Sequence, residues 1–146
     1  MAVVVRDFVG KDDWSWFIAR NPIKRVEDTC GRVVEDDETG EILAILIGDT
    51  WYGDSVSLHI VVMDKRAYEH ISEGFEFVFN NPKYPDVKIA YGFIPTNNEK
   101  GYKLIKRLGF KDAYTLSGGT DGTGFNITTM TREEYTKLKG VYHGST

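Results

Sequence analysis

Residues 87–111 read VKIAYGFIPTNNEKGYKLIKRLGFK and combine an apolar strand with an amphipathic helix. The composition predicts a strand over Val87–Ile94, which Pro95 ends. Residues 96–98 (Thr-Asn-Asn) can start the helix, because Asn and Thr side chains cap free backbone amides. Its apolar face is formed by Leu104, Ile105 and Leu108. Gly109 is typical of the position just after a helix end, and Phe110 follows as a hydrophobic anchor.

The region before this segment predicts a further strand and helix. Residues Ser55–Met63 read SVSLHIVVM and alternate between two faces, with Val56 and Leu58 on one face and His59 on the other. Asp64 is a good N-cap residue, and the apolar spacing after it predicts one continuous helix over Lys65–Asn80. Its predicted packing face consists of Ala67, Ile71, Gly74, Phe75 and Val78.

An acidic hairpin is predicted earlier in the chain. Its strands are Cys30–Glu35 and Glu41–Ile47, and the residues between them read DDETG. Gly40 suits a turn position with positive φ. A solvated turn accounts for the carboxylates, and a metal site is the alternative.

Shorter elements complete the predicted order. They are a strand at Ala2–Val5, a short helix opening at Trp14 and stopped by Asn21-Pro22, strands at Ala113–Leu116 and Phe125–Met130, and a last helix capped by Thr131 and Glu134. The glycine-rich residues 117–124 join two strands, which favours a hairpin over a dinucleotide site. The order β, α, β, β, β, α, β, α, β, β, α predicts one α/β (α+β) domain over residues 1–140. Residues 141–146 are expected to form a flexible tail.

Composition excludes several classes of protein. The chain has 146 residues, and its 18 basic and 22 acidic residues give a net charge of −4, so we expect no direct binding to nucleic acid. The longest apolar run, residues 42–47, is far shorter than the roughly 20 residues that span a bilayer, so no membrane association is expected. The single cysteine and three scattered histidines predict neither a disulfide nor a metal site. A reducing compartment fits, and we expect a cytoplasmic protein.

The helix after Pro95 resembles the acyl-CoA-binding region of the GNAT (GCN5-related) N-acetyltransferases. In that family an Asn opens a helix that ends in Gly-Phe, and here these residues are Asn98, Gly101 and the pair Gly109-Phe110. The resemblance spans roughly residues 32–110. It implies a mixed, mostly antiparallel sheet of six to seven strands flanked by helices. It also implies acetyl-CoA as co-substrate and a small-molecule or protein amine as acceptor.

The resemblance further implies that strands Ser55–Met63 and Val87–Ile94 splay apart and expose main-chain groups to the pantetheine arm. The cofactor-binding residues that it implies are Val61, Val62, Met63, Lys65, Arg66, Asn98 and Lys103. One departure concerns residues 63–70, MDKRAYEH, which lack the family's glycines. Asp64 occupies the helix amides that a phosphate would use. Lys65 and Arg66 are expected to compensate as side-chain phosphate ligands, the alternative being an ordinary solvated pair.

The second departure concerns the general acid. Family members often place a tyrosine seven residues after the Asn, which here is Ile105; Tyr102 is the substitute we consider. His59 is the candidate base, because histidine titrates near neutral pH and lies in mid-strand. A half-buried structural histidine is the alternative. The candidate acceptor-binding residues are Trp51, Tyr52 and Asp54, with Asp49 nearby in the same loop.

A non-catalytic function is the second hypothesis. The sequence also resembles small GNAT-like virion or head-assembly proteins of short-tailed bacteriophages, which have a degraded phosphate loop and lack the tyrosine. Such a protein would act as a binding module in the host cytoplasm or the virion, with a phage or host protein partner and a possible homo-oligomeric state. Its contact surface would use Trp14, Trp16, Trp51 and the basic helix that follows Asn98.

Overall fold

The computed structural model describes residues 3–21, 29–117 and 124–143, and their strands form one seven-stranded sheet. The strands are β1 Val3–Asp7, β2 Cys30–Asp36, β3 Ile42–Tyr52, β4 Ser55–Val62, β5 Ile89–Pro95, β6 Lys111–Leu116 and β7 Phe125–Thr131. Their order in the sheet is β1-β2-β3-β4-β5-β7-β6. β4 and β5 are parallel, and the other neighbouring pairs among the described strands are antiparallel. This confirms the predicted mixed, mostly antiparallel sheet.

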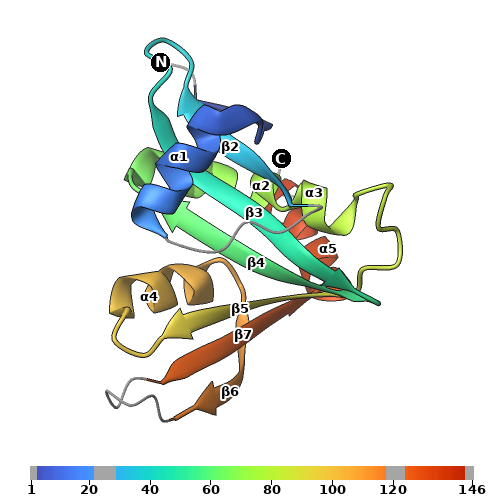
Figure 1. Cartoon of the computed structure of the whole chain (residues 1–146). Helices are drawn as coiled ribbons and strands as arrows, with labels where there is room; N and C mark the ends of the chain where they lie inside the picture. Colours follow the sequence, from blue (N-terminus) through green and yellow to red (C-terminus); the bar gives the residue numbers. More distant parts are fainter. Residues whose placement is uncertain (1–2, 22–28, 118–123, 144–146) are drawn as a thin grey trace.

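Helices cover both faces of the sheet (Figure 1). They are α1 Gly10–Arg20, the 3-10 helix η1 Lys65–His70, α2 Ile71–Gly74, α3 Glu76–Phe79, α4 Glu99–Arg107 and α5 Arg132–His143. α1 packs on one face through Trp14 and Phe17, which contact Val33, Ile45 and Ile47. The residues from η1 to α3, together with α4 and α5, pack on the other face around a larger core. Each face thus buries one apolar layer, as the alternation along β4 predicts.

The prediction of one continuous helix over Lys65–Asn80 is wrong. The segment folds as η1, α2 and α3, although Ala67, Ile71 and Phe75 are buried as predicted. Phe77 and Phe79 are buried too. Phe77, Val78 and Phe79 are consecutive and all buried, which the one-sided packing face of a continuous amphipathic helix does not provide. The separate short turn α3 buries all three side chains instead.

Several predicted helix ends are confirmed. Asn98 caps α4 by accepting a hydrogen bond from the Gly101 amide at 3.0 Å. Gly109 has φ of 101° beyond the end of α4, and Phe110 is 2% exposed. Thr131 and Glu134 form the reciprocal capping box of α5. That helix runs to His143, so residues 141–143, expected in the tail, are helical, whereas 144–146 lie outside the described residues.

The acidic hairpin differs from the prediction at one residue. Residues 37–41 are exposed, as a solvated turn requires. Asp36, however, is the last residue of β2 and is only 3% exposed. Its carboxylate accepts hydrogen bonds from the amides of Glu38 and Thr39 and pairs with Arg66. Asp36 is therefore a structural residue of the turn.

Candidate functional site

The strands β4 and β5 separate along most of their length. Their pairing covers only Ser55↔Ile89, Val56↔Ala90 and Ser57↔Tyr91, although β4 continues to Val62 and β5 to Pro95. Figure 1 shows the two strands joined at one end and diverging toward α4. The predicted splaying is confirmed.

A cleft of about 580 Å³ occupies the space between the diverging strands. Leu58–Val62 of β4 form one wall and Gly92–Pro95 of β5 the other. The lining also includes Asn98, Lys100, Gly101, Leu104 and Ile105 of α4, together with Phe125 and Thr128 of β7. This volume falls within the range of small-molecule sites, about 300–1,000 Å³.

Alternate residues of β4 turn their backbone groups toward the cleft. The Met63 amide donates to the Leu43 carbonyl of β3, so the antiparallel alternation also directs the backbone groups of Val61 and His59 to β3. The groups of Ile60 and Val62 then face the diverging β5. Val61, Val62 and Met63 are the strand positions expected to bind cofactor. Of these, Val62 alone turns its backbone amide and carbonyl toward the cleft. An unpaired strand edge of this kind can hydrogen-bond an extended amide chain.

His59 forms a polar cluster with two neighbours on the α1 face of the sheet. Its Nε2 lies 3.1 Å from Asp49 Oδ1 and 3.5 Å from Ser57 Oγ. The Asp49 side chain is 7% exposed and the His59 side chain 23%. An ionised carboxylate only accepts hydrogen bonds, so Asp49 fixes the proton of neutral His59 on Nε2. Nδ1 then carries the lone pair that can accept a proton.

A β-bulge accompanies Asp49. The β3–β4 register shifts between Asp49 and Tyr52, and Thr50 between them has φ of 51°, a value uncommon for a residue with a side chain. Bulges re-aim neighbouring side chains. The irregular backbone at Thr50 thus lies directly beside the carboxylate that orients His59.

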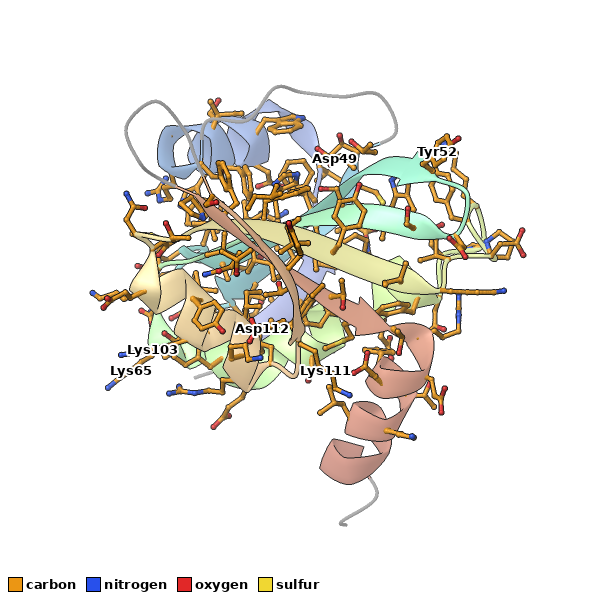
Figure 2. All side chains as sticks on the ribbon, turned by 90° about the horizontal axis from the view of Figure 1, so that it is seen from below. Asp49, Tyr52, Lys65, Lys103, Lys111 and Asp112 are labelled. Carbon is orange, nitrogen blue, oxygen red and sulfur yellow. The ribbon has the colours of Figure 1, made fainter. Side chains whose placement is uncertain are left out.

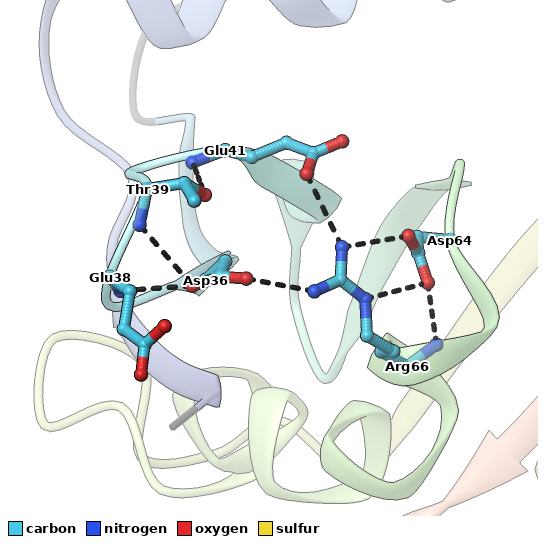
Figure 3. A network of polar contacts seen from close by, with 6 residues as sticks. All are labelled: Asp36, Glu38, Thr39, Glu41, Asp64 and Arg66. Carbon is cyan, nitrogen blue, oxygen red and sulfur yellow. Dashed lines mark hydrogen bonds and ion pairs between the residues drawn. The ribbon is translucent and has the colours of Figure 1, made fainter. Parts of the chain in front are cut away.

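Arg66 is held by three carboxylates (Figure 3). Its guanidinium lies 2.8 Å from Asp36, 2.9 Å from Asp64 and 3.3 Å from Glu41. The amides of Glu38 and Thr39 and the Arg66 guanidinium lower the pKa of Asp36, and the Arg66 side chain and amide lower that of Asp64. Asp64 also accepts from the Arg66 amide, which occupies the first turn of η1. A phosphate at Arg66 would compete with these carboxylates.

Three exposed lysines lie on α4 and η1, two elements that contribute residues to the lining of the cleft. Lys100 lines it, and both Lys65 and Lys103 are exposed. Figure 2 shows Lys65 and Lys103 on the side of the molecule opposite Tyr52. None of these three lysines makes an ion pair with a described residue. Their charges are available to an anionic ligand.

Tyr102 does not line the cleft. Its hydroxyl donates to Asp112, at 2.8 Å from either carboxylate oxygen, and this bond raises the pKa of Tyr102. The hydrogen bond from Tyr102 and that from Lys106 lower the pKa of Asp112. Ile105, at the position of the family's tyrosine, does line the cleft and has no proton to give. The Tyr102 hydroxyl, expected to reach the departing thiol, is thus held by Asp112 outside the cleft lining.

The predicted acceptor-binding residues lie away from the cleft. Trp51 stacks on Tyr84 with ring centroids 4.1 Å apart, and Tyr52 is 82% exposed. Asp54 lies in the turn before β4, at the end of the strand where β4 and β5 are still paired. None of the three residues lines the cleft. Arg20 and Asn21, at the end of α1, line it instead, and sequence reasoning missed both.

A second cavity of about 590 Å³ lies between η1–α3 and α5. Its polar lining includes Glu69, Glu73 and Glu76, and burial together with Glu76 raises the pKa of its Tyr135 to about 12. Among the described residues no histidine, lysine or arginine lines it, so it offers no cation to an anionic ligand. Among the described residues no cluster of metal-ligating side chains is found, and no helix is long and apolar enough to cross a bilayer.

Solved structures share this architecture. Mutant forms of the spermidine/spermine N-acetyltransferase SpeG from Vibrio cholerae superpose with a TM-score of 0.72 at 12% identity, covering 94% of this chain and 99% of that chain. SpeG in complex with CoA and spermine gives 0.62 at 14% identity, covering 86% and 77%. A putative phosphinothricin N-acetyltransferase gives 0.62 at 16%, covering 89% and 98%. No family model and no curated protein sequence matches the chain. At these identities the likeness establishes the fold.

Proposed function

Since the chain has the GNAT fold, we propose that it is an acetyl-CoA-dependent N-acetyltransferase that acts on an amine acceptor. The observation that carries the proposal is the cleft between β4 and β5, which has an unpaired strand edge on one side and the His59–Asp49 pair beside it. Fold alone does not fix function, so the proposal rests on these groups.

The cleft suits an acyl-CoA in shape and charge. The pantetheine arm is an extended chain with two amides, which the cleft-facing backbone groups of Ile60 and Val62 can bind. Its phosphates need cations, and Lys65, Lys100 and Lys103 supply them on the α4 side. Arg66 remains a predicted phosphate ligand, but its three carboxylate partners make the lysines better candidates. Asn98, whose Oδ1 caps α4, keeps its Nδ2 group as a donor at the cleft.

His59 acts as the general base in the proposed reaction. The amine nitrogen bonds to the thioester carbonyl carbon, and Nδ1 of His59 accepts the nitrogen's proton. Asp49 stabilises the resulting imidazolium through Nε2. The C–S bond then breaks, and its electron pair leaves with the sulfur.

The leaving thiol needs little help from the protein. An ordinary thiol has a pKa of about 8.5, so a thiolate departs near neutral pH without an obligatory acid. This is consistent with Ile105 at the family's tyrosine position and with the engagement of Tyr102 by Asp112. Solvent or the imidazolium supplies the proton.

We propose that the acceptor of the acetyl group is an amine. SpeG, one of the structural neighbours, is described in complex with spermine, which makes aliphatic polyamines the first acceptors to test. The acceptor would approach from the α1 face, where His59, Arg20 and Asn21 lie. Trp51, Tyr52 and Asp54 do not line the cleft, so the proposal assigns them no contact with the acceptor.

Calorimetry and thermal unfolding with acetyl-CoA test the proposal. Acetyl-CoA at 100 times Kd adds about 2.7 kcal/mol of stability, which raises the melting temperature by several degrees. Release of free thiol in the presence of spermine or a lysine peptide then reports transfer. Absence of both heat and stabilisation at high micromolar acetyl-CoA contradicts the proposal.

A non-catalytic binding module is the second candidate, and one observation favours it. Asp64 and Arg66 fill the first turn of η1, where GNAT enzymes hold the pyrophosphate. The predicted contact surface needs revision, since Trp14 is 9% exposed and Trp51 is stacked on Tyr84. A chain that binds no acetyl-CoA but captures a phage or host protein would support this candidate.

A further inference from the structure

Thr128 of β7 carries a buried hydroxyl that has no partner. The residue is 0% exposed, and Oγ1 makes no hydrogen bond to any residue that the structure describes. Buried hydroxyl groups are almost always hydrogen-bonded, because leaving one unpaired destabilises the fold. The unpaired Thr128 hydroxyl therefore calls for a partner outside the described chain.

Thr128 lies where β4 and β5 begin to part. It pairs with Gly92 of β5, one residue beyond Tyr91, the last residue of β5 paired with β4. Thr128, Gly92 and Leu58 all line the cleft. The hydroxyl is thus at the closed end of the cleft, away from the lysines of the α4 side.

Two oxygens lie in van der Waals contact with the position that a Cβ on Gly92 would take. A Cβ placed on Gly92 would lie 3.9 Å from Thr128 Oγ1 and 3.5 Å from the Leu58 carbonyl oxygen, both ordinary contact distances. The space therefore accepts a small group without strain. Only the hydroxyl has a hydrogen to donate, since a backbone carbonyl accepts.

The proposed function supplies a group for this space. The phosphates of acetyl-CoA are drawn to the lysines at the open end, so the thioester is the part that reaches the closed end. A thioester carbonyl oxygen only accepts hydrogen bonds. We propose that the Thr128 hydroxyl donates a hydrogen bond to the thioester carbonyl of the acyl donor, which makes Thr128 a further residue of the acyl site. This inference rests on the proposed acetyltransferase function.

Binding of acetyl-CoA and of free CoA to Thr128→Val tests the inference. Valine keeps the shape and removes the hydroxyl. The affinity for acetyl-CoA is expected to fall about five- to tenfold, which is the worth of one hydrogen bond, while that for CoA, which lacks the carbonyl, stays within about twofold. Thr128→Ser keeps the hydroxyl and should bind acetyl-CoA within about threefold of the wild type.

The melting temperature of the free protein gives an independent readout. Thr128→Val should melt at the same temperature as the wild type or higher, because no bond within the protein is lost. The matched control is Thr129→Val on the next position of β7, whose side chain is on the other face of the sheet; it should change neither ligand affinity. If Thr128→Val does not fold, Gly92→Ala fills the same space. This variant should weaken the binding of acetyl-CoA more than the binding of CoA.

Three outcomes separate the two proposals. If Thr128→Val weakens the binding of acetyl-CoA and of CoA equally, or changes neither affinity, the role of Thr128 is overturned and the proposed function stands. A lower melting temperature for Thr128→Val shows that the hydroxyl bonds within the protein and also overturns it. A wild-type chain that binds neither ligand removes the proposed function, and this inference with it.

Discussion

His59 illustrates how a strand pattern positions a reactive group. The alternation of β4 puts its side chain on the face opposite the aliphatic residues Val56 and Leu58, beside Asp49 of the neighbouring strand. Nε2 of its imidazole lies against an almost fully buried carboxylate, and among the described residues none is found hydrogen-bonded to Nδ1. These are the attributes of a base with a defined direction.

Replacement of His59 by Gln removes the base and keeps a polar side chain. We expect kcat for amine acetylation to fall about 10²- to 10³-fold, the range for loss of a general base, while the KM for acetyl-CoA stays within about threefold. Asp49→Asn should lower kcat by about tenfold, because an amide does not stabilise the imidazolium as a carboxylate does. Steady-state kinetics with saturating amine measures both values.

Tyr102→Phe is the matched control for these variants. Its hydroxyl is bonded to Asp112 outside the cleft, so kcat should stay within about threefold of the wild type. A Tyr102→Phe enzyme as impaired as His59→Gln would restore Tyr102 as the acid. A His59→Gln enzyme with near-normal kcat would remove His59 from the mechanism.

Sequence reasoning at this scale found His59 but not its partner. His59 was identifiable because alternation along one strand is local information. Asp49 belongs to another strand, and its loop-like surroundings of Gly48, Gly53 and Asp54 concealed that the strand continues to Tyr52. Thr128 carried no signal at all, since an unpaired hydroxyl is defined by what surrounds it.

At the scale of elements, α4 depends on glycine at its third residue. A Cβ on Gly101 would lie 2.6 Å from Asn98 Nδ2, so a larger residue displaces the capping side chain. The sequence shows both residues, and their spacing is that of a cap and the amide it binds.

Gly101→Ala is expected to separate stability from binding. Alanine gains about 1 kcal/mol in helix propensity, and the lost cap costs about 1 kcal/mol, so unfolding free energy should change by less than about 1 kcal/mol. Acetyl-CoA affinity should nevertheless fall about three- to tenfold, because Asn98 leaves the cleft. Urea unfolding and calorimetry measure the two quantities.

Asn98→Ala provides the comparison. It removes the same side chain without the gain in helix propensity. The variant should therefore lose about 1 kcal/mol of stability and show the same three- to tenfold fall in acetyl-CoA affinity. If Gly101→Ala binds acetyl-CoA as tightly as the wild type, Asn98 is only a helix cap.

The Arg66 cluster joins η1 to the β2–β3 hairpin and predicts a pH dependence. The pKa values of Asp36 and Asp64 lie below their ordinary value of 3.8. Carboxylates with depressed pKa stabilise the fold above their unfolded pKa, and this contribution is lost as the pH falls through the folded values. Arg66→Gln should therefore be less stable than the wild type at pH 7, and the difference should shrink below about pH 4.

Urea unfolding at pH 7, 5 and 3 measures this trend. Lys103→Gln is the control, because Lys103 is exposed and makes no ion pair with a described residue. A stability difference between wild type and Arg66→Gln that is the same at all three pH values contradicts the role of these ion pairs.

At the scale of the whole molecule, the sheet is two blocks joined by a short seam. β1 to β4 form one antiparallel block and β5, β7 and β6 the other, and only three residue pairs connect β4 to β5. Helices on one face span both blocks through a common core. The cleft lies where the pairing stops, beyond Ser57 and Tyr91.

Hydrogen exchange should show this division along β4. The amides of Ile60 and Val62 face the cleft, so they should exchange at least about tenfold faster than those of Val61 and Met63, which face β3. Acetyl-CoA should slow the exchange of Ile60 and Val62. Amide exchange followed by NMR, with and without ligand, measures this pattern; uniform protection along β4 in the free protein would contradict an open cleft.

The element order, the helix caps at Asn98, Gly109 and Thr131, and the apolar faces of β4 and α4 follow from the amino-acid sequence, because they depend on neighbours within a few residues. Other features arise from tertiary contacts. The predicted helix over Lys65–Asn80 breaks, and Arg66 is held by carboxylates of the β2–β3 hairpin as well as by Asp64. Asp49 contacts His59, and the Tyr102 hydroxyl bonds to Asp112. Such contacts depend on the positions of separate elements in space, which local periodicity does not encode.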